Sequence, residues 1–393
     1  MIDTTHRFRA TAALFAGVGL SATGFITLIT VTPLVAEDLL GSARWSGLPT
    51  ALAIIGTAVG TSWLSFVMSR HGRRRGLLLG YFTAMAGSTV AALAVGASIF
   101  PLLALSLFVL GAGYGASRLS RYAAADFYEP ERQARAIGWV VWAGTVGSVL
   151  GPILLEPSHT LSSTLGFPSI VGPFLVAALA MGSAGFVLLV AFPGGSPTEA
   201  TQKAGSSLPL HHLRHAKGQV ALAALVIGQV VMILIMAMTP VHLRSAGGGL
   251  QSIGLVIAAH TFGMYALSPL SGYLSDHFGR RPVILFGGAL LVSAGLVSSG
   301  AGSDTTQLAL GLFLLGWGWN LSFVSGSALL TEAVPSENRM RLQGFADSVV
   351  WTSAAAAGLS SGVLLESVGF ATLCRIGALL ALAPAAVLAL RRW

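Results

Sequence analysis

The sequence predicts an all-α integral membrane protein with twelve transmembrane helices, and three observations support this prediction. The 393-residue chain is 54% hydrophobic and only 9% charged, which is too apolar and too long for a soluble core. Runs of about 20 mostly apolar residues, each long enough to cross the hydrocarbon layer, recur along its whole length. Basic residues collect in alternate predicted loops. Because lipid offers the backbone no hydrogen-bond partners, each span must be a helix.

The first expected span directly follows the N-terminal segment MIDTTHRFRA. Its apolar run, residues 10–36, is too long for the apolar region of a cleavable signal peptide, and no convincing cleavage site is present. We therefore expect a span whose N-terminus lies in the cytoplasm. The remaining spans, which also return the C-terminus to the cytoplasm, are expected at about 46–68, 76–98, 100–126, 134–156, 168–191, 219–243, 251–275, 283–302, 305–330, 342–366 and 369–390.

The net charge of +8 does not indicate a nucleic-acid partner, because the basic residues follow the predicted topology. The predicted outside loops contain only Arg44 and Arg244, whereas the basic residues of the other loops and of the termini lie in cytoplasmic segments. This asymmetry matches the positive-inside rule, and the partner that it predicts is the lipid bilayer. The single cysteine, Cys374, excludes a disulfide within the chain and a cysteine-rich metal site.

An internal repeat divides the chain into two halves. The segment SRHGRR at residues 69–74 recurs as DHFGRR at residues 276–281, and GAG at 111–113 recurs as GWG at 316–318. We therefore expect two six-helix halves, residues 1–191 and 219–393. Residues 192–218, which are rich in proline, glycine, serine and threonine, are expected to form a cytoplasmic linker.

The loop after the second span of each half carries the most specific local motif. In the second half it reads G-x-x-x-D-x-x-G-R-R, formed by Gly272, Asp276, Gly279, Arg280 and Arg281. The first half keeps the final glycine and both arginines but has serine at the first glycine and at the aspartate; its residues are Ser65, Ser69, Gly72, Arg73 and Arg74.

Carboxylates end the neighbouring spans, Glu332 in the tenth and Asp126 in the fourth. We expect Glu332 and Asp276 to lie near Arg280 and to hold the cytoplasmic helix ends together in one state, with Asp126 beside the basic loop in the first half. Charges at membrane depth are expected to be paired and functional. The alternative is that the basic loops only anchor the spans and that the acids at the membrane edge are solvated.

Two arginines, Arg118 and Arg121, lie within the inner third of the fourth span. An arginine at the centre of a spanning helix costs about 2.5–3.5 kcal/mol on insertion scales. Arg121 and Asp126 are poorly placed in helix phase to pair, so we expect the partners of these arginines on other helices. The two arginines have two alternative roles. They act in gating or coupling, or their side chains simply extend to the lipid headgroups.

A glycine pattern in the fifth span predicts close helix packing and a bend. Gly147 and Gly151 are four residues apart and allow another helix to approach, and Pro152 removes a backbone N–H.

Two pairs of soft metal ligands lie on consecutive spans. Met232 and Met236 are four residues apart in the seventh span, and His260 and Met264 are four apart in the eighth. Each pair therefore lies on one helix face, and at about 1.5 Å per residue the pairs overlap in depth near the bilayer midplane. Thioether and imidazole groups together suit Cu(I). Met238 and His242, near the outer end of the seventh span, are expected to line the route in.

The ordinary alternative is that these methionines are apolar packing residues, since methionine is a common flexible filler. His260 favours the metal site over simple packing, because burying a titratable residue in mid-span is energetically costly and marks a candidate functional residue by default.

Two six-span halves, a basic loop after spans two and eight and a polar linker resemble the major facilitator superfamily. The G-x-x-x-D-x-x-G-R-R loop is the most specific part of this resemblance, and the span-five glycine pattern is similar to that of many proton antiporters of the superfamily. The resemblance implies a monomer that binds substrate between its halves near the midplane and that rocks to alternate access.

The segments MILIMAMTPVH and IAAHTFGMYALSP, together with RYAAADF and LLTEAVP, look like the CcoA-type copper importers, a branch of this superfamily. The resemblance implies that Met232, Met236, His260 and Met264 bind copper as a transported substrate rather than a cofactor. It also implies copper uptake across the bacterial cytoplasmic membrane for cytochrome c oxidase assembly, with a copper acceptor in the cytoplasm. The same branch is similar to riboflavin carriers.

Other functions compete with copper import as interpretations of these residues. An importer of riboflavin or another organic nutrient would use polar and aromatic residues of the cavity, such as Asn320, Trp317, Trp139, Trp142 and Tyr265. Proton-coupled drug efflux is disfavoured because Leu107 stands where many such exporters have an arginine. A sensor is disfavoured because no soluble output domain is appended. We expect no enzyme, because the sequence has no nucleotide-binding loop and no metal-water site with a carboxylate base.

Overall fold

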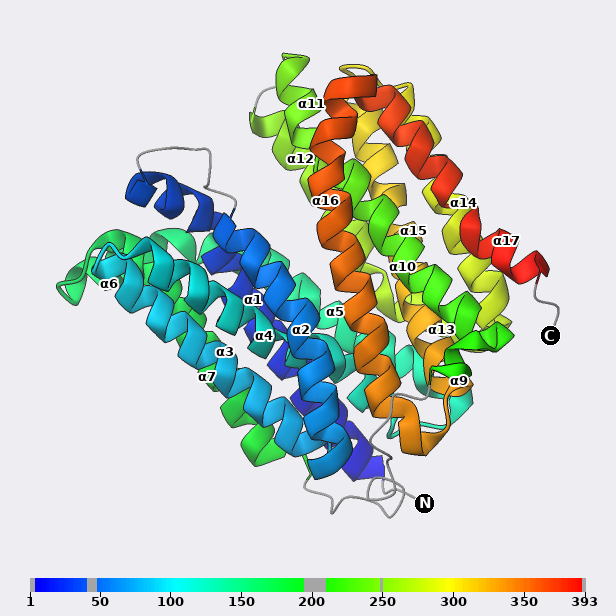
Figure 1. Ribbon diagram of the computed structural model, residues 1–393, viewed down its shortest axis with the longest axis horizontal. Coiled ribbons are helices and arrows are strands. Elements are labelled where there is room, and N and C mark those ends of the chain that lie inside the picture. Colours follow the sequence, from blue (N-terminus) through cyan, green and yellow to red (C-terminus); the bar gives the residue numbers. More distant parts are fainter. Residues whose placement is uncertain (1–3, 41–47, 194–209, 248–249, 391–393) are drawn as a thin grey trace. The chain divides into compact units, whose positions relative to one another are not determined.

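The computed structural model describes residues 4–40, 48–193, 210–247 and 250–390 (Figure 1). Every regular element in these ranges is a helix, which confirms the predicted all-α class. Most of the predicted linker falls within residues 194–209, which lie outside the described residues, as does Arg44.

Within the described residues, ten helical segments are long and apolar enough to cross a membrane, and a bent pair of helices raises the number to eleven. The long helices are α1 (Thr4–Leu40), α2 (Leu48–His71), α3 (Arg73–Gly96), α4 (Phe100–Ala125), α5 (Gln133–Ile153), α7 (Gly172–Ala191), α10 (Ala216–Met236), α14 (Arg280–Ser299), α15 (Thr305–Ala333) and α16 (Ser336–Leu380).

The bent pair joins α12 (Leu250–Thr261) and the π-helix η4 (Phe262–Ala266) to α13 (Ser268–Phe278), with a bend of 44°. The short elements are η2 (Pro130–Arg132), α6 (Leu155–Thr164), η3 (Ser169–Val171), α9 (His211–Arg214), α11 (Thr239–Ser245) and α17 (Ala383–Leu390).

The helices form two compact units that do not follow the repeat boundary strictly. Unit 1 contains residues 1–127, 143–208 and 336–351, and unit 2 contains residues 128–142, 209–335 and 352–393. The N-terminal part of α16 therefore belongs to unit 1, and the N-terminal part of α5 belongs to unit 2. Each unit thus includes a helix segment from the other half of the sequence.

In unit 1, α4 packs against α2 and α3, while α7 packs against α1 and α3 (Figure 1). Glycine makes these helix contacts close. A Cβ atom added at Gly60 of α2 would overlap the backbone of Ala112 in α4, and one added at Gly113 of α4 would overlap the backbone of Ala84 in α3. Small residues allow helices to approach in this way in a membrane, where packing contributes much of the association energy.

We predict that Gly60→Ala lowers the free energy of unfolding by about 3 kcal/mol, because the methyl group would press on the backbone of α4. Gly254→Ala is the matched control, since a Cβ atom there meets nothing within 4 Å and alanine favours helix by up to about 1 kcal/mol. Detergent-induced unfolding of the two purified variants measures the difference. Equal stabilities would contradict the close contact between α2 and α4.

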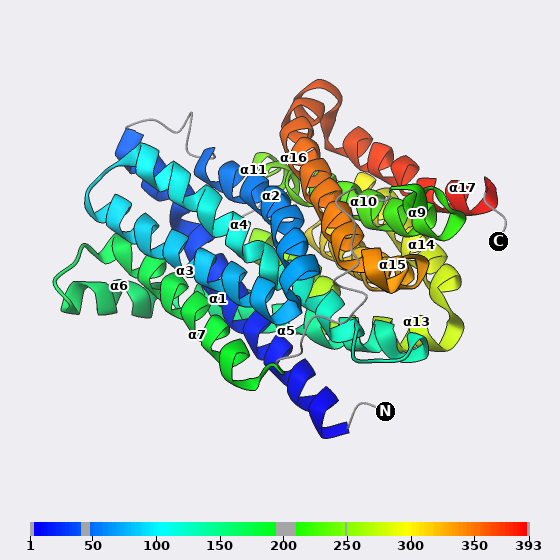
Figure 2. The same cartoon turned by 60° about the horizontal axis from the view of Figure 1, so that its bottom comes forward.

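In unit 2, α15 is the central helix, because α10, α12, η4, α13 and α14 all pack against it. The C-terminal α17 lies beside α10 and α14 (Figure 2). The long helix α16 is broken at Gly369, whose φ of 76° lies in the left-handed region that favours glycine. The chain therefore turns at this residue.

Candidate functional site

The methionine pair of the seventh span lies on a helix that packs against α15. Gln229 of α10 accepts a hydrogen bond from the indole N–H of Trp319 at 2.8 Å, so this face of α10 is turned toward α15. Met232 and Met236 follow Gln229 by one and two helical turns on the same stripe. Met232 is buried and Met236 is partly buried. The stripe predicted from spacing is thus turned inward within unit 2.

His260 is buried against α15 in an arrangement that fixes its tautomer. Its Nδ1 lies 3.0 Å from the carbonyl oxygen of Leu312. A carbonyl can only accept, so Nδ1 carries the hydrogen and Nε2 carries the free lone pair. Nε2 is buried and has no hydrogen-bond partner. Metal-bound histidines usually donate their other ring N–H to a carbonyl or carboxylate in the same way.

Met264 follows His260 through a π-helix rather than a regular α-helix. The π-helix η4 starts at Phe262, and Asn320 of α15 donates hydrogen bonds of 2.7 Å to the Met264 carbonyl and to the Ser268 hydroxyl beyond it. These bonds satisfy backbone and side-chain groups where the helix bends. Single π-turns within α-helices are rare and are frequent at functional sites.

Helix α15 is the element that the two ligand pairs share. α10 packs on one part of it and the α12–η4 segment on another, whereas α10 and α12 contact each other little. A Cβ atom added at Gly316 of α15 would meet the His260 carbonyl oxygen and the Met264 amide nitrogen. Trp319, three residues further along α15, donates its hydrogen bond to Gln229 of α10. The pairs therefore approach similar levels of α15, although their helices are not directly packed as a neighbouring pair.

No group of three or more histidine, cysteine, aspartate or glutamate side chains in the described ranges could hold a metal ion. A metal site here would depend on methionine sulfur together with His260.

The two residues that were expected to line the route in, Met238 and His242, lie at α11. His242 donates from Nε2 to the Gly302 carbonyl at 2.8 Å and stacks on Phe370 at 4.1 Å, and Met238 precedes this short helix.

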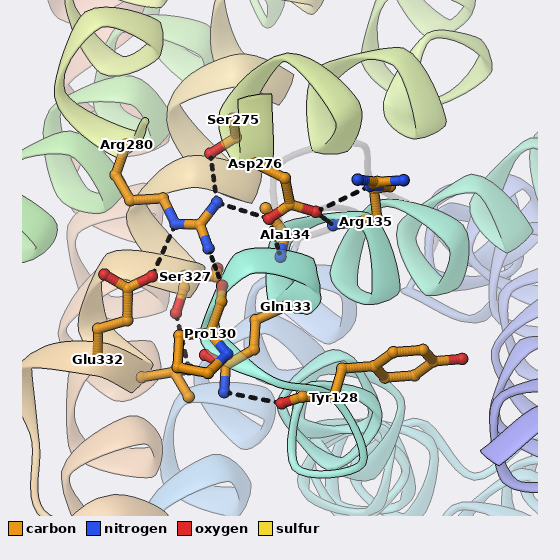
Figure 3. Close-up of polar contacts among 11 residues, drawn as sticks. Tyr128, Pro130, Gln133, Ala134, Arg135, Ser275, Asp276, Arg280, Ser327 and Glu332 are labelled. Carbon is orange, nitrogen blue, oxygen red and sulfur yellow. Dashed lines mark hydrogen bonds and ion pairs between the residues drawn. The ribbon is translucent and has the colours of Figure 1, made fainter. Parts of the chain in front are cut away.

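The loop motif of the second half forms a charge cluster around Asp276 (Figure 3). The Asp276 side chain is fully buried and accepts from Arg280 at 2.6 Å. It also accepts from the backbone N–H groups of Ala134 at 3.2 Å and of Arg135 at 2.9 Å, and from Nε of Arg135 at 3.2 Å. Asp276 therefore caps the N-terminus of α5, where backbone N–H groups lack partners within the helix.

We name these residues, together with Glu332 and Pro130, the Asp276 cluster. Arg280 joins three elements of it. Besides Asp276, it donates to Glu332 at the end of α15 at 2.8 Å and to the carbonyl of Pro130 in η2. The predicted proximity of Arg280 to Glu332 is thus observed. Gly272 permits the approach, because a Cβ atom there would lie 2.5 Å from the Ala134 carbonyl oxygen.

The first-half motif builds a similar but weaker cluster within unit 1. Arg73 donates to Asp126 at 2.8 Å and to Gln343 of α16 at 2.7 Å, and Arg339 lies 4.0 Å from Asp126. Gly72 and Gly279 take the same left-handed conformation, with φ of 86° and 88°, which agrees with the internal repeat. The following arginines, Arg74 and Arg281, are the second residues of α3 and α14; Arg74 donates to the Leu189 carbonyl at 2.5 Å.

Arg121 has the partner on another helix that its position required. It donates to Asp347 of α16 at 2.6 and 3.1 Å, and Tyr122 donates to the same carboxylate at 3.2 Å. The side chains of Arg121 and Asp347 are only 3% and 1% exposed. Asp347 was one of several acids at membrane depth in the sequence, and nothing in the spacing distinguished it. Arg118 makes no such ion pair within the described residues and instead lies between two aromatic rings.

The glycines of the fifth span pack against α1, as expected from their spacing. A Cβ atom at Gly147 would lie 2.5 Å from Cβ of Ala22, and one at Gly151 would lie 2.6 Å from the Ile26 side chain. Pro152 is followed by the end of α5 at Ile153, a few residues before the predicted end of this span.

A family model described as the Major Facilitator Superfamily matches residues 14–253 and 220–392. The chain is 34% identical over 381 residues to the uncharacterized MFS-type transporter YddS of Bacillus subtilis (strain 168), a match that covers 94% of this chain and 86% of the relative. It is 28% identical over 376 residues to the riboflavin transporter RfnT of Brucella anthropi, covering 95% of this chain and 93% of that one.

Solved structures agree in fold. The E. coli fucose:proton symporter FucP superposes with a TM-score of 0.77 at 14% identity, covering 99% of this chain and 100% of that chain. A bacterial homologue of the iron transporter ferroportin superposes with a TM-score of 0.75 at 16% identity, covering 96% and 98%. At these identities the likeness concerns the fold alone. The family model and the relatives above 30% identity, which match nearly the whole chain, show that this chain belongs to the Major Facilitator Superfamily.

Proposed function

We propose that this multi-pass membrane transporter imports copper, as Cu(I), across the bacterial cytoplasmic membrane. The observation that supports this proposal most is the buried Nε2 lone pair of His260, whose ring is held by the Leu312 carbonyl. Met232, Met236 and Met264 would add sulfur ligands. Thioether and neutral imidazole prefer Cu(I) to hard cations, and their lack of charge favours release after binding.

The transport cycle would use alternating access of two six-helix halves, residues 1–191 and 219–393, joined by a cytoplasmic linker. Division of Ser336–Leu390 at Gly369 supports the twelve spans of this proposal, which places both termini in the cytoplasm and takes the monomer as the working form. The Asp276 cluster and the Arg121–Asp347 pair join segments of the two halves, and Arg73 contacts both Asp126 of its own half and Gln343 of the other. We assign these contacts to holding the cytoplasmic helix ends in one state. The ion would pass to a copper acceptor in the cytoplasm, for cytochrome c oxidase assembly.

Riboflavin import is the second candidate, and two observations favour it. One relative, at 28% identity across 95% of this chain, is a riboflavin transporter. In unit 2, Trp319 stacks on Phe323 at 4.6 Å, meets Tyr265 edge to face at 6.2 Å and bonds Gln229. Aromatic faces beside an amide suit a planar ring system with hydrogen-bonding edges.

We predict that His260→Ala and Met232→Leu each reduce copper uptake by at least about tenfold, because each removes a ligand atom, and Met232→Leu nearly conserves volume. Uptake of radioactive copper is measured in cells that lack their own importer, at equal membrane abundance. Met181→Leu is the matched control, since Met181 is fully buried in unit 1 and should retain uptake within about twofold.

Riboflavin uptake is measured in parallel in the same cells. Copper uptake that survives both ligand substitutions would contradict the proposed copper path. Riboflavin uptake without copper uptake would make riboflavin, rather than copper, the proposed substrate. A loss of riboflavin uptake in Trp319→Leu would then assign the aromatic residues around Trp319 to riboflavin binding.

A further inference from the structure

Arg118 is a membrane-depth cation that the ion pairs of unit 1 leave without a carboxylate. Both oxygens of Asp347 are engaged by Arg121, and Asp126 is engaged by Arg73. The Nε atom of Arg118 is buried and has no hydrogen-bond partner. None of the ion pairs among the described residues includes this side chain. Arg118 does interact electrostatically with Asp347, but Arg121 occupies both oxygens of that carboxylate, so two arginines share one acid and one positive charge is in excess. An excess charge within a span is costly and is a candidate for function.

Two aromatic rings from different helices hold the Arg118 guanidinium. Its central carbon lies 4.9 Å from the ring centre of Tyr114 on α4 and 4.6 Å from that of Trp351 on α16. Tyr114 is itself stacked on Phe25 of α1, with ring centres 4.1 Å apart and an interplanar angle of 5°. Cation–π contacts orient a guanidinium and lower its desolvation cost, but they leave its charge in place. The group is thus positioned without being neutralised.

We propose that Arg118, Tyr114 and Trp351 form a binding site for a planar organic anion of the aryl carboxylate class. A guanidinium presents a rigid fork of N–H donors that matches a carboxylate in two-point contact. Trp351, which is partly exposed, provides aromatic surface beside that fork for an aromatic body to contact, whereas Tyr114 is buried against Phe25 and positions the guanidinium. The site consists only of unit 1 residues, goes beyond the proposed copper path, and is tested independently of it.

The test uses the purified full-length chain in lipid nanodiscs and radiolabelled 2-naphthoate as the probe. We expect saturable binding that is at least about tenfold tighter than that of the uncharged 2-naphthylmethanol, which competes poorly. Arg118→Gln should weaken binding by about tenfold or more, and Trp351→Leu by about fivefold. Arg70→Gln is the matched control: Arg70 also lies over a ring, that of Phe66 at 4.4 Å, but it is in the last turn of α2, so its substitution should leave binding unchanged.

A stability measurement separates binding from a structural role. Removal of an unpaired cation should leave the Tm of Arg118→Gln equal to or above that of the parent chain. If this variant does not fold, Arg118→Lys decides, since it keeps the charge but loses the fork and should weaken binding by about threefold. No 2-naphthoate binding up to millimolar concentration, unchanged binding in the arginine variants, or equal binding of 2-naphthylmethanol would each overturn the proposal.

Discussion

Replacement of Asp347 by alanine is expected to lower the free energy of unfolding by about 3–5 kcal/mol, because it leaves the buried Arg121 guanidinium without its carboxylate. Both side chains are nearly inaccessible, so solvent cannot replace the lost carboxylate. Tyr122 also loses its acceptor. The measurement is detergent-induced unfolding of the purified variant, read by tryptophan fluorescence and by the amount of monodisperse protein after heating.

Two further variants make the prediction for Asp347 specific. Glu366→Ala removes an exposed carboxylate from the same helix and should change stability by no more than about 0.5 kcal/mol. The double variant Arg121→Met/Asp347→Leu removes both charges and should be more stable than Asp347→Ala, since an apolar pair avoids the uncompensated ion. A double variant that is less stable than the single one would show that Arg121 is satisfied by other groups.

The second large effect is expected at Asp276. Asp276→Ala should lower the free energy of unfolding by about 2–4 kcal/mol, because it removes the cap of α5 and one of the two carboxylates that face Arg280. If the Asp276 cluster holds the cytoplasmic helix ends in one state, substrate uptake should fall further than the amount of folded protein. Unfolding and uptake are therefore measured on the same membrane preparations.

Asp304→Ala is the matched control for helix capping. Asp304 accepts from the N–H groups of Thr306 and Gln307 at the start of α15, at an exposed site without an arginine. Its loss should cost only about 1 kcal/mol and leave uptake unchanged. Equal costs at Asp276 and Asp304 would mean that the ion pair with Arg280 adds nothing to the cap.

Local spacing in the sequence was sufficient for some of these contacts and insufficient for others. Asp276 and Arg280 are four residues apart on a motif that repeats between the halves, so their pairing could be predicted. The partner of Arg121 could not, because sequence does not define how one span is rotated relative to another. Asp347 could be distinguished from other acids only once α16 was seen beside α4.

The surroundings of His260 show the same limit. The histidine and its distance from Met264 were apparent from the sequence, and each pair was expected on a single α-helical face. The π-helix η4 and the Leu312 carbonyl depend on packing against α15, and Leu312 is 52 residues from His260 in the sequence. The periodicity of the sequence likewise could not predict that α15 is the shared neighbour of both ligand pairs.

The Arg121–Asp347 pair also has a consequence for biosynthesis. The two residues are 226 positions apart, and residues 336–351 of unit 1 are made after residues 128–142 and 209–335 of unit 2. At about 5–20 residues per second, Arg121 leaves the ribosome about 10–45 seconds before its partner. During that interval the fourth span carries a cation without its carboxylate, so the nascent first half must wait, incompletely assembled, for a segment that is made near the end of translation.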